Sequence, residues 1–151
     1  MASKEQQLSD FRSLLPPAEV LDRDSPSYKE ASAPWSVWAD RSPTLAVQPT
    51  TLDGMSAVVK ALYSSSLDFA IRNTGTGSAS AEDVILSTQG FKSFTYDSAS
   101  EVVTIGSGFA WGEVDALMEE HAPGSQVVGA RCSWVGVTGS SLVGGLSWLS
   151  Q

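Results

Sequence analysis

The stretch TLAVQPTTLDGMSAVVKALYSSSLDFAIRN, residues 44–73, places a helical pattern between two short apolar runs. The first run, TLAVQP, is closed by Pro49 and is typical of a buried strand. Apolar side chains then recur at helical spacing from Leu52 to Leu62, behind threonines that can cap a helix N-terminus. The second run, LDFAIRN, is again strand-like. The stretch therefore predicts a strand–helix–strand unit.

Three further strand-like runs lie downstream, at residues 84–88, 91–97 and 101–109, and we expect the last two to pair antiparallel. Residues 110–124, AWGEVDALMEEHAPG, predict a helix that ends at its Pro-Gly pair. The apolar face of this helix would carry Trp111, Val114, Leu117 and Met118. Together the elements predict an α+β fold: a small strand–helix–strand layer joined to a mixed β-sheet with helices, including the one near residues 110–122, packed on it.

Residues 1–40 differ in composition from the rest of the chain. They are rich in Pro, Ser and charge, and their short apolar clusters keep no sustained period. We interpret them as an N-terminal arm that lies on the domain of residues 41–151, and we expect Trp35 and Trp38 to pin it there.

Length and composition favour one globular domain, because the 151 residues are 42% apolar and only 17% charged. A net charge of −8 argues against a nucleic-acid partner, since no broad positive field is available for phosphates. Cys132 is the only cysteine, which excludes an internal disulfide, and the first residues lack the apolar stretch of a signal peptide. No run approaches the roughly 20 apolar residues that span a bilayer. We therefore expect a cytoplasmic protein that does not enter membranes.

Two Gly-rich segments, residues 72–77 (RNTGTG) and 136–145 (GVTGSSLVGG), are the most specific features for binding. Gly75 and Gly77 begin a dinucleotide fingerprint, but Ser80 stands at its third position and a strand-like run follows where a helix is required. The second segment lacks the lysine of a phosphate-binding P-loop. Neither established phosphate motif is therefore complete.

Two interpretations of these segments stay open. In the first, both loops present backbone N–H groups to one long anionic ligand, because glycine allows the main chain to come close, and Arg72 and Arg131 offset local charge. In the second, NTGTGS is a solvated turn and Arg72 is a surface residue. The residues predict no catalytic group and no metal site, because one His and one Cys fall short of a metal-ligand set.

Four segments appear in the order that they have in a known family: residues 28–62, 67–78, 101–118 and 127–150. Together they resemble the flavin-binding half of the vanillyl-alcohol oxidase and berberine bridge enzyme group, the PCMH-type FAD domains, and fungal members most of all. The resemblance implies a half-domain fold of two small α/β parts with FAD between them. It also implies hydride transfer from an organic metabolite to the flavin.

The resemblance also assigns site residues. The pyrophosphate loop would consist of Arg72, Asn73, Thr74, Gly75, Thr76 and Gly77. The flavin side would be lined by Cys132, Gly136, Gly139 and Gly144. Thr76 stands where many members carry a histidine that bonds covalently to the flavin, so that bond is not expected here. Cys132 lies where doubly linked members make a second bond, and both a single thioether and an inert buried thiol stay open. Trp134 replaces a small residue and could fill part of the flavin pocket.

The resemblance ends at residue 151, before the rest of the FAD domain and the substrate domain of full-length members. We therefore expect a truncated FAD-binding module of a flavin-dependent oxidoreductase, with no catalytic residue identified. The alternative is a flavin-free pseudoenzyme that binds a small organic metabolite, or a non-redox cyclase, in fungal secondary metabolism. The absent part also predicts a homo-oligomer or a complementing chain.

Overall fold

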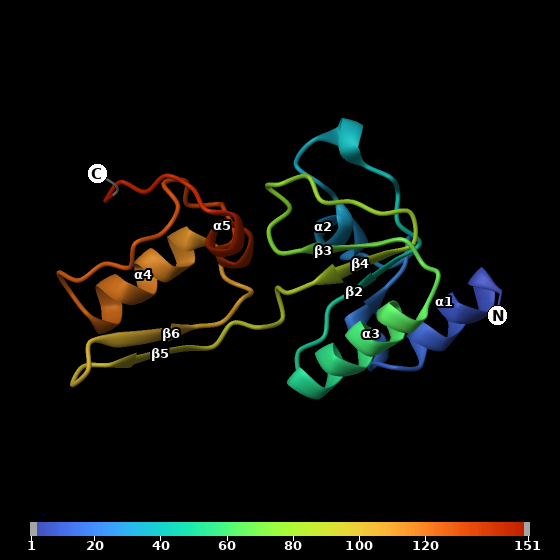
Figure 1. Cartoon of the computed structure of the whole chain (residues 1–151), viewed down its shortest axis with the longest axis horizontal. Coiled ribbons are helices and arrows are strands. Elements are labelled where there is room, and N and C mark those ends of the chain that lie inside the picture. Colours follow the sequence, from blue (N-terminus) through green and yellow to red (C-terminus); the bar gives the residue numbers. More distant parts are fainter. Residues whose placement is uncertain (1–2, 150–151) are drawn as a thin grey trace. The chain divides into compact units, whose positions relative to one another are not determined.

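The structure is a computed structural model that describes residues 3–149, and it consists of two compact units (Figure 1). The first unit is Met1–Gly90 and the second unit is Phe91–Gln151. Within the described residues, no helix is both long enough and apolar enough to cross a membrane.

A four-stranded mixed sheet forms the centre of the first unit, in the order β1-β2-β4-β3. Its strands are β1 (Val20–Leu21), β2 (Leu45–Val47), β4 (Val84–Ser87) and β3 (Phe69–Arg72). β2, β4 and β3 run parallel, with both Leu45 and Phe69 opposite Val84, whereas β1 pairs antiparallel with β2. The predicted strand–helix–strand unit is confirmed, and β4 pairs between its two strands.

Helix α3 (Leu52–Ser64) connects β2 to β3, and its N-terminus is capped as the sequence predicts. The Thr51 hydroxyl oxygen accepts a hydrogen bond from the Gly54 N–H at 3.1 Å. Such a cap satisfies one of the N–H groups that the first turn of a helix leaves without an intrahelical partner. The helix α3 packs on the sheet through Val58 and Leu62, whereas its exposed side carries Leu52 and Tyr63 beside polar residues.

Helices cover both faces of this sheet (Figure 1). On one face, α1 (Lys4–Arg12) and α3 pack on the apolar side chains of β2 and β4 that point towards them. This cluster contains Phe11, Val58, Leu62, Leu45, Val47, Val84 and Leu86. On the other face, α2 (Tyr28–Ser32) places Ala31 against Ala46 and Ile85. Successive strand residues alternate between the two faces, so a central strand that is covered on both sides must be apolar throughout.

The N-terminal residues are held differently from the prediction. Trp35 and Trp38, which were expected to pin them, are 71% and 95% exposed. Trp35 lies just before the short 3₁₀ helix η2 (Val37–Ala39), and Trp38 lies within it. Phe11, Leu15 and Val20 are buried instead, the last of these just after the 3₁₀ helix η1 (Pro17–Glu19). The prediction about the two tryptophans was wrong, because their indoles lie in the connection between α2 and β2 and are exposed to solvent.

The second unit contains a β-hairpin and two helices. β5 (Phe94–Asp97) and β6 (Val102–Ile105) pair antiparallel with Phe94 opposite Ile105, as predicted. α4 (Trp111–His121) and α5 (Val137–Val143) follow. The predicted apolar face of α4 is confirmed, because Trp111, Val114 and Met118 are buried and Leu117 packs at the edge of the same cluster.

Helix α4 packs with the hairpin and α5, whereas the sequence interpretation placed it on the mixed sheet. The reason is the position of β4. All four residues of β4 are buried, so this strand needs cover on both faces and lies at the centre of the first sheet. β5 and β6 alternate between half-buried and exposed residues, which suits a hairpin with one covered face.

The Trp111 indole joins the two helices of the second unit. Its Nε1 donates a hydrogen bond to Ser140 Oγ at 2.7 Å, which connects α4 to α5. The backbone of Gly129 lies against the ring, so closely that a Cβ there would be 2.3 Å from Trp111 Cε3. Only glycine fits at this position without displacing the indole.

We expect Gly129→Ala to lower the free energy of unfolding by about 1–3 kcal/mol, because the new methyl group must displace Trp111. Urea denaturation followed by tryptophan fluorescence measures this change. Gly139→Ala is the matched control, since a Cβ at Gly139 has no atom within 4 Å. An exposed Gly→Ala change in a helix leaves stability unchanged or raises it by up to about 1 kcal/mol. Equal stability of the two variants would contradict the packing argument.

Candidate functional site

Residues 73–78 form a loop that leaves β3 at the carboxyl end of the parallel strands. The Thr88 N–H donates to the Arg72 carbonyl oxygen at 2.9 Å, so the loop begins directly where the pairing of β3 with β4 ends. Open sheets with parallel strands bind ligands outside this edge. The first Gly-rich segment therefore occupies a position in the fold that suits a binding site.

Arg72 lies beneath this loop and is 6% exposed. Its Nη1 donates to the carbonyl oxygens of Ala31 (3.0 Å) and Asn73 (3.3 Å). Its Nη2 donates to the carbonyl oxygens of Ala33 (3.1 Å) and Thr74 (3.4 Å). The interpretation of Arg72 as a surface residue is therefore wrong, because the side chain joins the loop to the end of α2.

Burial lowers the pKa of the Arg72 guanidinium below its ordinary value, and the Glu30 carboxylate acts in the opposite direction. A buried cation is unfavourable unless polar groups replace its water shell. Here the carbonyl oxygens of Ala31, Ala33, Asn73 and Thr74 replace it. An arginine remains protonated even when burial disfavours its charge.

Gly75 occupies a position that only glycine fits. Its φ is +82°, a left-handed conformation that is strained for other residues. A Cβ at Gly75 would also lie 2.7 Å from Arg72 Nε. The Gly75 carbonyl oxygen accepts hydrogen bonds from the N–H groups of Trp35 (3.1 Å) and Ser78 (2.8 Å), which hold the loop against the segment after α2.

The loop turns its carbonyl oxygens inward and leaves N–H groups available. The carbonyl oxygens of Asn73, Thr74 and Gly75 all accept hydrogen bonds from within the protein. In contrast, the N–H groups of Thr74, Gly75 and Gly77 donate to no acceptor among residues 3–149. Successive backbone N–H groups without internal partners form the kind of concavity that binds oxyanions. A Cβ at Gly77 would meet no atom within 4 Å, so the approach to the loop is open there.

The residues assigned to the flavin side lie in the second unit, around α5. Gly136 is the N-cap of α5 and pairs with Ala110 in an isolated antiparallel bridge. Gly139 is exposed on α5, and Gly144 ends this helix with a φ of +92°. Cys132 has a free, half-buried thiol in the turn before α5. The two groups of predicted site residues therefore belong to different units, and their binding of one ligand stays a prediction.

The two tryptophans of the second unit differ in environment. Trp111 is a core residue, as expected from its helical spacing with Val114 and Met118. Trp134 is 55% exposed in the turn before α5. That its indole fills part of a flavin pocket stays a prediction. The guanidinium carbon of Arg131 lies 5.5 Å from the centroid of the Trp148 ring. This cation–π contact directs the charge of Arg131 towards the indole.

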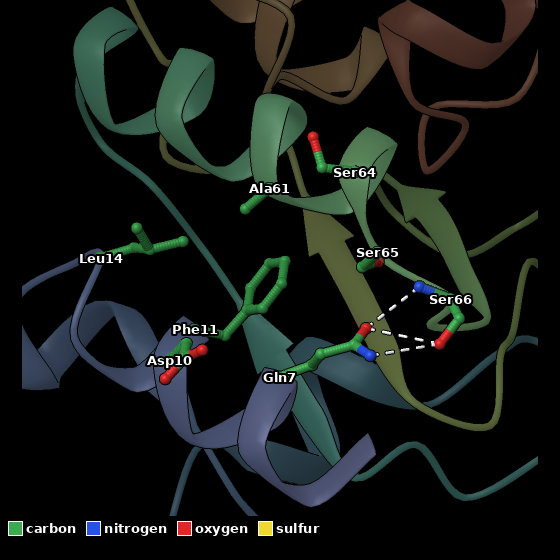
Figure 2. Close-up of a pocket in the computed structure, with 8 residues that line it drawn as sticks. All are labelled: Gln7, Asp10, Phe11, Leu14, Ala61, Ser64, Ser65 and Ser66. Atoms are coloured by element: carbon green, nitrogen blue, oxygen red, sulfur yellow. Dashed lines mark hydrogen bonds between the residues drawn. The ribbon is translucent and has the colours of Figure 1, made fainter. Parts of the chain in front are cut away.

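A separate hollow of about 400 Å³ lies between α1 and the C-terminal end of α3 (Figure 2). Figure 2 shows the Phe11 ring directed from α1 towards Ala61 of α3, with the Leu14 side chain beside it. At the polar edge, Gln7 Oε1 accepts a hydrogen bond from the Ser66 N–H at 3.0 Å. The sequence did not predict this hollow, because it depends on how closely α1 approaches α3. It opens on the α3 face of the sheet, whereas Arg72 reaches the α2 face.

Among residues 3–149, no group of three or more His, Cys, Asp or Glu side chains is placed to hold a metal ion. His121, the one histidine, has its ring 5.5 Å from that of Phe94, centroid to centroid.

Comparison with known proteins identifies the family to which the chain is similar. A family model described as a FAD binding domain matches residues 43–151. An uncharacterized FAD-linked oxidoreductase of Arthroderma benhamiae is 32% identical over 114 residues, which cover 72% of this chain and 22% of the relative. The FAD-dependent monooxygenase prx3 of Penicillium roqueforti is 30% identical over 124 residues, which cover 78% of this chain and 24% of that protein.

Solved structures agree on the fold. Wild-type BBE-like 1 of Physcomitrella patens superposes with a TM-score of 0.71 at 22% identity, over 95% of this chain and 31% of that one. The xylooligosaccharide oxidase of Myceliophthora thermophila superposes with a TM-score of 0.72 at 22% identity, over 95% of this chain and 30% of that one.

The chain thus spans 22% to 31% of the length of these relatives and structures. The family match covers well over half of the chain, and it includes the strand–helix–strand unit, the 73–78 loop and the whole second unit. The resemblance of the four sequence segments to PCMH-type, berberine bridge enzyme-like proteins is confirmed. The chain belongs to the FAD binding domain family.

Proposed function

We propose that this chain is a FAD-binding module of a flavin-dependent oxidoreductase, and that residues 72–77 hold the FAD pyrophosphate. The observation that carries the proposal is the orientation of the loop. Its carbonyl oxygens are bound inside the protein, and the N–H groups of Thr74, Gly75 and Gly77 have no acceptor among the described residues. Such N–H groups can donate to phosphate oxygens.

Backbone recognition suits the charge of this protein. With a net charge of −8, the chain has no broad positive surface to attract a phosphorylated ligand. N–H dipoles supply a local positive potential without adding a charged side chain, and glycine lets the ligand come close to them. The family's cofactor and the chemistry of the loop therefore agree.

We assign the flavin side to the second unit, by the resemblance described above. The residues concerned are Cys132, Gly136, Gly139 and Gly144. FAD, when bound, supplies the capacity to accept hydride from an organic metabolite, and the protein supplies binding and orientation. No residue of this chain is assigned a proton-transfer role.

The first prediction is that FAD raises the thermal unfolding temperature, because a ligand that binds only the folded state stabilises it. At a free FAD concentration of 100 times Kd, the stabilisation is about 2.7 kcal/mol.

Gly77→Ala should weaken FAD binding by about tenfold without changing stability in the absence of FAD, since the new Cβ meets only open space. Ser56→Ala is the control, because Ser56 is an exposed residue of α3 outside both Gly-rich segments. Absence of any FAD-induced shift in the parent protein would contradict the proposal.

The second prediction concerns covalent attachment. We expect FAD to be released when the loaded protein is denatured in acid, because Thr76 offers no imidazole for a covalent bond. Absorbance of the precipitate at flavin wavelengths measures this. A yellow precipitate whose colour disappears in Cys132→Ala would show instead that the half-buried thiol forms a thioether.

A second candidate function is a flavin-free pseudoenzyme, either a binder of a small metabolite or a non-redox cyclase in fungal secondary metabolism. The hollow between α1 and α3 supports it, because its volume of about 400 Å³ suits a small organic molecule and its floor is apolar. Thr76 in place of a histidine also supports it. The two functions are separated by measuring the thermal unfolding temperature with FAD and, in parallel, with each member of a metabolite panel. Stabilisation by FAD alone would reject this second candidate.

We further propose that the protein self-associates or binds a complementing chain through the segment after Val137. Four apolar side chains of this segment, in and after α5, are between 70% and 89% exposed: Leu142, Val143, Leu146 and Trp148. Exposed apolar surface of this kind is typical of interaction sites.

The third prediction is that the molar mass measured by light scattering at high protein concentration is that of a dimer or a larger species. Leu142→Asp/Leu146→Asp should increase the monomer fraction, because the charges oppose burial of this surface. Tyr63→Asp is the control, since Tyr63 is 92% exposed on a different helix. A clean monomer of the parent protein across the concentration range would reject self-association.

A further inference from the structure

We propose that Arg72 is a positioning residue for the cofactor loop, acting through the direction of its peptide groups and making no contact with the phosphates. This inference rests on the proposed function. It differs from the simpler expectation that an arginine beside a phosphate loop binds the phosphate directly. Three features of the structure support it.

The first feature is the geometry of the peptide group. In a planar trans peptide, the C=O of one residue and the N–H of the next point in opposite directions, and the described chain has no cis peptide. Arg72 holds the carbonyl oxygens of Asn73 and Thr74 inward. The N–H groups of Thr74 and Gly75 must then point outward. These are two of the N–H groups that no described residue accepts from.

The second feature is that the guanidinium has no outward donor. Each Nη carries two N–H bonds and donates to two carbonyl oxygens, so all four are used inside the protein. The remaining donor, Nε, is buried and makes no hydrogen bond to any residue between 3 and 149. Gly75 covers it, because a Cβ at Gly75 would lie 2.7 Å away. Arg72 therefore has no N–H group that is both free and exposed for direct contact with a phosphate.

The third feature is the anchor. Ala31 and Ala33 lie at the C-terminal end of α2, where helix carbonyl oxygens lack intrahelical partners and a cation is favourable. The same segment donates twice more to the loop, from Trp35 N–H to the Gly75 carbonyl oxygen and from Ser36 N–H to Ser78 Oγ (3.2 Å). These hydrogen bonds thus attach the loop to a helix that is distant in sequence, since Ala31 precedes Arg72 by 41 residues.

Arg72→Lys separates the two roles. Lysine keeps the positive charge but has three donors on one atom, so it cannot hold two pairs of carbonyl oxygens as the planar guanidinium does. Arg72→Met removes both the charge and the donors. If the peptide directions matter, the two variants behave alike; if the charge binds phosphate, lysine retains most of the affinity.

The experiment measures Kd for FAD by flavin fluorescence, and amide hydrogen exchange without ligand, in the parent protein and both variants. We expect both variants to bind FAD at least about tenfold more weakly, as the loss of charge-assisted hydrogen bonds suggests. We also expect faster exchange confined to residues 73–78, with β2 and β4 still protected. Arg41→Lys and Arg41→Met are the controls, because Arg41 is an exposed arginine of the same unit that pairs with Asp68 and Glu82.

Three outcomes would overturn the inference: FAD affinity in Arg72→Lys within about twofold of the parent protein, unchanged exchange at residues 73–78, or loss of protection throughout the sheet. Gly75→Ala supplies a second test if Arg72→Met fails to fold, since it displaces the loop from Nε and leaves the charge in place. It should reproduce the Arg72→Lys result. If the parent protein binds no FAD, the proposed function fails, whereas the exchange measurement still decides whether Arg72 holds the loop.

Discussion

The guanidinium of Arg72 is the interaction on which the candidate site depends. It is buried at the end of β3 and binds carbonyl oxygens from two segments, the end of α2 and the start of the Gly-rich loop. An unpaired cation in this position would be strongly unfavourable, so burial of Arg72 favours keeping the two segments together. The hydrogen bonds that stabilise the buried guanidinium therefore also restrict the conformation of the loop.

An acidic protein that binds a phosphorylated cofactor must avoid repelling it. The loop that we propose to hold the cofactor offers backbone N–H groups, and the cation below it faces carbonyl oxygens. Gly75 is required by its positive φ and by the guanidinium beneath it, while Gly77 leaves the outer side open. The two glycines of this short loop thus have different physical roles: Gly75 packs against the guanidinium, and Gly77 keeps the outer side of the loop accessible.

Each unit has a core of its own. In the first unit, parallel strands are covered by α1 and α3 on one face and by α2 on the other. In the second unit, Trp111 of α4 contacts Gly129 closely and donates to Ser140 of α5. The family match extends across both units. The residues that the resemblance assigns to the pyrophosphate belong to the first core, and those that it assigns to the flavin belong to the second.

Local sequence by itself determined the elements whose signals lie within a few residues. The Thr51 cap, the helical spacing of α3 and α4, and the β5–β6 hairpin follow from short-range periodicity and turn chemistry, as does the Gly-rich loop. Only the tertiary structure decided that β4 lies between β2 and β3, that Trp35 is exposed, and that Arg72 is buried. These features depend on contacts between segments far apart in the chain. Two of the four carbonyl oxygens that bind Arg72 come from Ala31 and Ala33, and no spacing around residue 72 reveals them.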